Sequence, residues 1–71
     1  MKVMVTGNGG REHALAWRAS QSKDVDIVYV APGNAGTALE PGLSNVDIDV
    51  MDIAGQIQFA RDNDVELTII G

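Results

Sequence analysis

A glycine-rich segment near the start of the chain has the residue types of an anion-binding loop. Residues 7–13 read Gly-Asn-Gly-Gly-Arg-Glu-His and directly follow a short apolar run. If a helix starts near Gly10, the glycines let the backbone approach a ligand and the unpaired N–H groups of the first turn face an anion. Arg11 adds a guanidinium that can hold a phosphate through two hydrogen bonds. This segment predicts a phosphate or carboxylate site; the alternative is a tight turn that uses glycine for geometry alone.

The loop departs from the common nucleotide-binding motifs. A Walker A loop ends in Gly-Lys-Ser/Thr, which does not occur in this chain. The dinucleotide fingerprint needs a third glycine where Glu12 stands and an acidic residue at the end of the second strand. Asp24 and Asp26 instead precede that strand. We therefore expect a terminal phosphate on a small sugar rather than NAD or FAD.

Two titratable residues of this loop have different expected roles. Glu12 falls at the third helical position if Gly9 is the N-cap, so its carboxylate could cap free backbone N–H groups or bind a ribose hydroxyl or an amine. His13 has no partners for a nucleophilic triad and is interpreted as structural rather than catalytic. We expect no catalytic residue in this chain.

A second turn-forming segment, residues 32–37, reads Pro-Gly-Asn-Ala-Gly-Thr. It is either a simple turn or a second wall of the anion pocket, because the carboxyl ends of parallel strands meet at one edge of a sheet. Three acidic residues further on, Asp47, Asp49 and Asp52, do not fit a calcium loop, which requires Gly where Asp52 stands. We expect a solvated edge and a helix cap there, and no metal site.

Apolar runs predict the strands that position these loops. Residues 2–6, 27–30 and 65–70 are rich in β-branched side chains, and the first and last are apolar at nearly consecutive positions, as in strands covered on both faces of a parallel sheet. Residues 46–50 alternate apolar and acidic side chains, which predicts an edge strand. Residues 31–43 contain proline and glycine and are expected to form an irregular crossover.

Two segments have helical spacing. Residues 10–22 carry Leu15 and Ala19 four positions apart among other small or apolar side chains, which predicts a closely packed helix. A second helix is predicted between Asp52 as N-cap and Asn63 as C-cap, with an apolar stripe formed by Ile53, Ile57 and Ala60. Gly55 weakens this helix by about 1 kcal/mol relative to Ala.

The order of these elements implies a doubly wound parallel α/β sheet. Right-handed crossovers give the strand order 3-2-1-4, with the two helices on opposite faces. Ligands bind such sheets beyond the carboxyl ends of the strands where the winding reverses. Those ends are Gly7 and Gly71.

Length and composition limit the classes of protein. A chain of 71 residues buries only about 60 % of its unfolded surface, which allows one small domain. Its formal charge of −5 is the wrong sign for binding nucleic acid over a broad face. No apolar run is long enough to cross a bilayer, and the first residues lack a signal-peptide pattern, so we expect a cytoplasmic protein with no membrane partner.

Three segments together resemble the start of the phosphoribosylamine-glycine ligase (glycinamide ribonucleotide synthetase) family. They are the glycine loop with its helix in residues 7–17, Val-Ala-Pro-Gly-Asn-Ala-Gly-Thr-Ala in residues 30–38, and Asp-Val-Glu-Leu-Thr-Ile-Ile-Gly in residues 64–71. The resemblance extends over all 71 residues and implies a Rossmann-like, pre-ATP-grasp fold. Residues 1–71 would be the N-terminal part of that domain, incomplete and without the ATP-grasp domains.

The resemblance also implies a reaction and a site. Family members use ATP, with Mg²⁺ or Mn²⁺, to join glycine to 5-phosphoribosylamine in purine biosynthesis, and are expected to be monomers. The matched substrate-binding positions are Asn8, Gly9, Gly10, Arg11, Glu12, Gly33 and Asn34. Gly9, Gly10 and Arg11 would hold the 5-phosphate, Glu12 would lie near the ribose or amine, and Gly33 and Asn34 would close the pocket. ATP and metal would bind outside the chain, which alone would be inactive.

A stand-alone module that binds a sugar phosphate or a dinucleotide, without catalysis, is the alternative function.

Overall fold

A computed structural model describes residues 1–71, and four parallel strands form one sheet. The strands are β1 (Lys2–Gly7), β2 (Ile27–Pro32), β3 (Leu43–Asn45) and β4 (Val65–Ile70). The helices are α1 (Gly10–Ser20), α2 (Ala35–Leu39) and α3 (Ile53–Asp62). The strand order is β3-β2-β1-β4, as predicted from the winding rule. None of these helices has both the length and the apolar composition needed to span a lipid bilayer.

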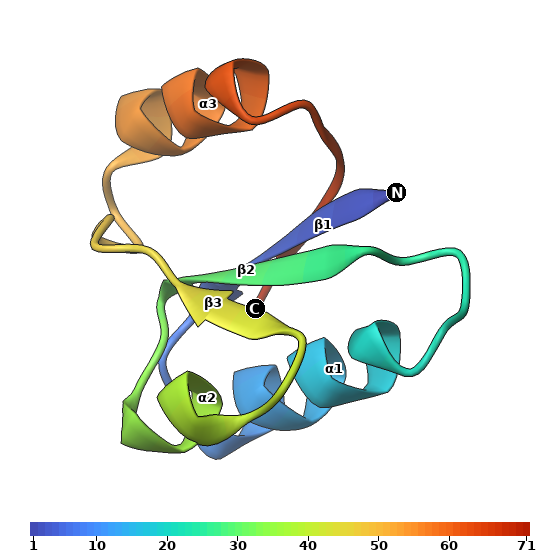
Figure 1. The fold of residues 1–71 in the computed structure, drawn as a ribbon. Coiled ribbons are helices and arrows are strands. Elements are labelled where there is room, and N and C mark those ends of the chain that lie inside the picture. The colour runs from blue at the N-terminus through green and yellow to red at the C-terminus, as the bar shows by residue number, and fades with distance from the viewer.

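The helices lie on both faces of the sheet: α1 and α2 cover one face, and α3 lies over the other (Figure 1). The first face holds the apolar core, in which alternate residues of β1 and β2 pack with α1 and β3. The members of this core are Val3, Val5, Ala16, Val28, Val30 and Leu43. On the α3 side, the rings of Tyr29 and Phe59 pack edge to face with their centres 4.8 Å apart. The predicted doubly wound α/β architecture is therefore confirmed.

The prediction of an edge strand at residues 46–50 is wrong, because β3 ends at Asn45. Leu43 is buried in the core and fixes which residues pair with β2. Val46 still donates to the carbonyl of Val30 at 2.9 Å, but Ile48 then donates back to the carbonyl of Val46 at 2.8 Å, so the chain turns away. The alternating apolar and acidic residues 46–50 therefore form a turn and not a hydrogen-bonded strand.

The prediction of an irregular crossover at residues 31–43 is also wrong in part. β2 continues to Pro32, and α2 occupies Ala35–Leu39. Asn34 starts this short helix through a capping box with Thr37, in which the Asn34 side chain accepts from the Thr37 N–H at 2.9 Å. The glycines and prolines of this segment led to the prediction of irregular structure, whereas the side chains of Asn34 and Thr37 start a helix there.

Two predicted apolar surfaces are more exposed than expected. In α1 the buried residue is Ala16, whereas Leu15 is 39 % exposed. In α3, Ile53 and Ile57 are 56 % and 50 % exposed. The expectation that the last strand is covered on both faces fails, because Leu67 and Ile70, which point to opposite faces of β4, are 47 % and 71 % exposed. The burial expected for both strands holds for β1.

Candidate anion-binding site

The carboxyl ends of three strands meet at one edge of the sheet. Gly33, just after β2, donates its N–H to the carbonyl of Gly7 at 3.1 Å, and Gly71, just after β4, donates to the carbonyl of Thr6 at 3.0 Å. Both predicted loops therefore start side by side, next to the predicted crevice between β1 and β4.

Glycine is required at two of these strand ends. Gly7 has φ +144° and Gly33 has φ +76°, conformations that strain other residues. A Cβ at Gly7 would overlap the side chain of Glu12, and one at Gly33 would overlap the carboxamide of Asn45. These glycines let side chains from elsewhere lie directly on the backbone at the edge of the site.

The start of α1 is open to a ligand. Gly9 is the N-cap in extended conformation, and the first helical hydrogen bond runs from the His13 N–H to the Gly9 carbonyl at 3.0 Å. The N–H groups of Gly10, Arg11 and Glu12 precede that bond and have no helical acceptor. A Cβ at Gly10 would meet nothing within 4 Å, and the exposed Arg11 forms no ion pair. This geometry can accept an anion from solvent.

Asn34 joins the two loops. Its side-chain Nδ2 donates to the carbonyl of Asn8 at 2.8 Å, while its Oδ1 caps α2. The structure thus brings the residues predicted from the second segment, Gly33 and Asn34, against the first loop. That they form a second wall of an anion pocket stays a prediction.

Glu12 lies at the crevice between β1 and β4. Hypothetical side chains at Gly7 and at Gly71 would both overlap its Cγ, so Glu12 extends between the two strand ends. Its carboxylate forms no hydrogen bond with a backbone N–H, and the capping role is not realised. A carboxylate there can accept a hydrogen bond from a hydroxyl or an amine.

The side chain of His13, in α1, lies against α2 on the core side of the sheet. Its Nε2 is 3.2 Å from Glu40 Oε1, and a Cβ at Gly36 would lie only 2.9 Å from the imidazole Cε1. These contacts hold α1 against α2 and support the structural interpretation of His13.

Three other acidic side chains have hydrogen-bond partners of their own. Asp26 accepts from the N-terminal ammonium of Met1 at 2.7 Å, at the opposite end of β1 from Gly7. Asp49 accepts from the Met51 N–H at 2.8 Å, and Asp52 accepts from the Gly55 N–H at 2.9 Å as the predicted N-cap of α3. No three His, Cys, Asp or Glu residues gather as a group that could hold a metal ion.

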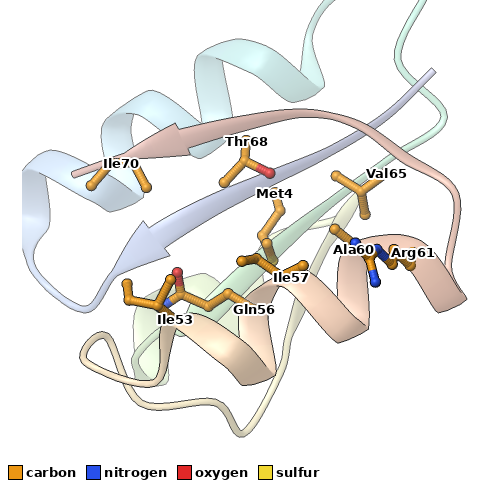
Figure 2. A pocket seen from close by; sticks show the side chains of 9 residues that line it. All are labelled: Met4, Ile53, Gln56, Ile57, Ala60, Arg61, Val65, Thr68 and Ile70. Carbon is orange, nitrogen blue, oxygen red and sulfur yellow. The ribbon is translucent and has the colours of Figure 1, made fainter.

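Sequence reasoning missed two polar residues and a groove. Thr37 and Asn45 hold the second loop through side-chain hydrogen bonds, whose only sequence signal was the Asn-x-x-Thr spacing from Asn34 to Thr37. A groove of 370 Å³ lies between α3 and the sheet (Figure 2). It is lined by the predicted apolar stripe of α3 together with residues of β1 and β4, namely Met4, Ile53, Gln56, Ile57, Ala60, Arg61, Val65, Thr68 and Ile70.

The whole chain, residues 1–71, matches the family described as "Phosphoribosylglycinamide synthetase, N domain". The chain belongs to this family. Proteins named phosphoribosylamine–glycine ligase are similar to it over all 71 residues: that of Vibrio parahaemolyticus is 59 % identical, that of Salmonella typhi 65 % and that of Escherichia coli 63 %. The chain spans 17 % of the length of each of these relatives. Membership in the synthetase N-domain family confirms the resemblance noted in the sequence.

Proposed function

We propose that these 71 residues form the phosphoribosylamine-binding part of an ATP-dependent ligase of purine biosynthesis. The complete reaction joins glycine to 5-phosphoribosylamine and yields glycinamide ribonucleotide, ADP and phosphate. The observation that carries the proposal is identity of 59–65 % over the entire chain to proteins named phosphoribosylamine–glycine ligase. The convergence of both glycine loops at one sheet edge supports it independently.

Each part of the substrate has a matching group in the proposed site. The N–H groups at Gly9 and Gly10 and the guanidinium of Arg11 hold the 5-phosphate by charge-assisted hydrogen bonds. Glu12, at the β1–β4 crevice, accepts from a ribose hydroxyl or from the amine. The loop at Gly33 and Asn34, with Asn8 across from it, closes the other side.

The acidic residues of the chain do not fit a divalent metal ion. Mg²⁺ and Mn²⁺ bind through carboxylates, but Asp49 and Asp52 are engaged as turn and helix caps, and no cluster of acidic residues forms. We propose that ATP, the metal and glycine bind to other parts of the ligase. As the N-terminal part of a pre-ATP-grasp domain, the 71 residues are then inactive by themselves, and the complete ligase is a cytoplasmic monomer.

The alternative of a stand-alone dinucleotide-binding module is disfavoured by the position of its required carboxylate. A ribose-binding acid should follow β2 at the same edge as the glycine loop. Asp24 and Asp26 instead precede β2, and Asp26 binds the N-terminal ammonium at the far end of the sheet.

A titration of the isotope-labelled chain with ribose 5-phosphate tests the site by NMR. We expect saturable shifts of the amide signals of residues 9–12, and weakening by about 10- to 100-fold in Arg11→Ala, because hydrogen bonds to charged groups contribute about 1.5–3 kcal/mol. The matched control is Arg18→Ala, in the last turn of α1, which should bind as the wild type does.

Two results would count against the proposal. Saturable NADH binding without a response to ribose 5-phosphate would favour the stand-alone module. Formation of glycinamide ribonucleotide by the purified chain with ATP, glycine and phosphoribosylamine would overturn the assignment of an inactive part.

A further inference from the structure

Asn45, the last residue of β3, forms hydrogen bonds through both the oxygen and the nitrogen of its carboxamide. Both bonds go to the segment that follows β2. The Asn45 Oδ1 accepts from the Thr37 hydroxyl at 2.6 Å, and the Asn45 Nδ2 donates to the carbonyl of Asn34 at 2.9 Å. The Asn45 side chain also lies directly over Gly33. An edge-strand residue is therefore bonded to the second wall of the proposed site.

Thr37 completes this connection from the buried side, being only 1 % exposed. Its Oγ1 accepts from the Asn34 N–H at 2.8 Å. The hydroxyl has one hydrogen and two acceptors in reach, Asn45 Oδ1 at 2.6 Å and the Asn34 carbonyl at 3.0 Å. The shorter contact is with Asn45, and the carbonyl already receives Asn45 Nδ2. Both backbone polar groups of Asn34 are thus held by Thr37 and Asn45.

The Asn34 side chain transmits this order to the glycine loop. Its Nδ2 donates to the Asn8 carbonyl at 2.8 Å. In a trans peptide the C=O and the following N–H point in opposite directions, so holding the Asn8 carbonyl fixes the direction of the Gly9 N–H. A carbonyl engaged by Asn34 is also kept from turning toward a bound anion.

We propose that Asn45 is a positioning residue for the sugar-phosphate site. It fixes the Asn34 peptide, and Asn34 then orients the Asn8–Gly9 peptide before a ligand arrives. Such preorganisation improves affinity by removing the cost of ordering the loop on binding. The inference rests on the proposed function for its ligand, but the orientation of the Gly9 N–H can be measured without one.

The test compares Asn45→Ala with Ser44→Ala, its neighbour on β3, whose side chain forms no hydrogen bond. Residual dipolar couplings of the ligand-free, isotope-labelled chain report the direction of the Gly9 N–H. We expect this coupling to change in Asn45→Ala while the couplings of β1 stay the same. Ribose 5-phosphate should bind about 2- to 10-fold more weakly, the range expected for one net hydrogen bond. Ser44→Ala should leave both readouts unchanged.

A second pair of variants tests the same connection from the helix. Thr37→Val removes the hydroxyl at similar size and should reproduce both effects of Asn45→Ala. Thr37→Ser keeps the hydroxyl, so its Gly9 coupling and its affinity for ribose 5-phosphate should match those of the wild type. This pair decides the matter if Asn45→Ala fails to fold.

The outcomes separate this inference from the proposed function. An unchanged Gly9 coupling and unchanged affinity in folded Asn45→Ala, or in folded Thr37→Val, would overturn the positioning role. Failure of the wild-type chain to bind ribose 5-phosphate would overturn the proposed function, whereas the coupling would still report on the connection from Asn45 to Gly9.

Discussion

Glu12 places a carboxylate next to the open N–H groups of the proposed site. Its side chain lies on Gly7 and Gly71, and its Oε2 would be 3.1 Å from a Cβ at Gly9, the N-cap of α1. A carboxylate repels phosphate but attracts the donors of a hydroxyl or amine. The loop therefore places a hydrogen-bond acceptor beside hydrogen-bond donors, and the proposed ligand, which carries both a phosphate and an amine, could use both.

An ion pair between the N-terminal ammonium of Met1 and the carboxylate of Asp26 lies at the opposite end of the sheet and responds to pH. The hydrogen bond to Asp26 raises the pKa of the N-terminal ammonium above 8.0, and the same bond lowers the pKa of Asp26 below 3.8. The ammonium's contribution to stability is present below its unfolded pKa and is lost as pH rises through the raised value. The Asp26 contribution is present above its unfolded pKa and is lost as pH falls through the lowered value.

We expect Asp26→Asn to return the pKa of the Met1 ammonium toward its ordinary value. An NMR titration of the Met1 signals would measure this change. Asp24→Asn is the control, because it keeps the backbone carbonyl that binds the ammonium and removes only the smallest of the charges that raise its pKa, so it should lower that pKa much less than Asp26→Asn does. An ammonium that titrates at the same pH in wild type and Asp26→Asn would show that the contact does not form in solution.

The site residues differ in how far the sequence could predict them. The glycine loop could be predicted because Gly7, Gly10 and Arg11 are local signals, and topology alone places residue 33 beside Gly7. Asn45 could not, because its partners are 8 and 11 residues away and depend on where β3 pairs with β2. The alternating pattern after Asn45 placed that strand too late.

At the scale of elements, the N-cap of α3 explains why a glycine stands at position 55. Gly55 looks like a weak point, since Ala is about 1 kcal/mol better in an open helix position. In the structure, a Cβ at Gly55 would overlap the Asp52 carboxylate, which caps the helix by accepting the Gly55 N–H. The glycine makes room for the cap.

We therefore expect Gly55→Ala not to bring the usual gain of about 1 kcal/mol, because losing the N-cap costs about the same amount, so the free energy of unfolding should stay the same or fall. Urea unfolding followed by circular dichroism measures the change. Gly10→Ala is the matched control in the first turn of α1, where a Cβ meets nothing within 4 Å, and its stability should stay the same or rise. A stabilised Gly55→Ala would show that Asp52 does not cap α3 as described.

At the scale of the whole molecule, tight packing is concentrated around β1 and β2. Residues Val3–Thr6 of β1 are all at most 4 % exposed, whereas β4 is exposed along much of its length and α3 leaves a groove above the sheet. The strand order could be predicted because right-handed crossovers permit few arrangements. The uneven burial could not, because β1 and β4 have similar apolar sequences, and only the structure shows that β1 lies between two strands and packs against α1 whereas β4 has one neighbouring strand.

This distribution predicts that one residue at the centre of the sheet has a disproportionate effect on folding. At about 0.05–0.15 kcal/mol per residue, a chain of this size is stable by about 4–11 kcal/mol. Met4, in β1 beneath α3, is 1 % exposed, and truncating a buried methionine costs about 2–5 kcal/mol (Figure 2). Met4→Ala should therefore lower the urea midpoint by a large share, whereas Leu39→Ala, at an 86 % exposed position, should change stability by less than about 0.5 kcal/mol. Equal destabilisation by Met4→Ala and Leu39→Ala would contradict the central role of β1.

The Met4 variant also tests whether the groove and the glycine loops are independent. Because Met4 faces α3 rather than the glycine loops, the molecules of Met4→Ala that remain folded should bind ribose 5-phosphate with wild-type affinity. Weakened binding by folded Met4→Ala would show that the groove and the loops are coupled.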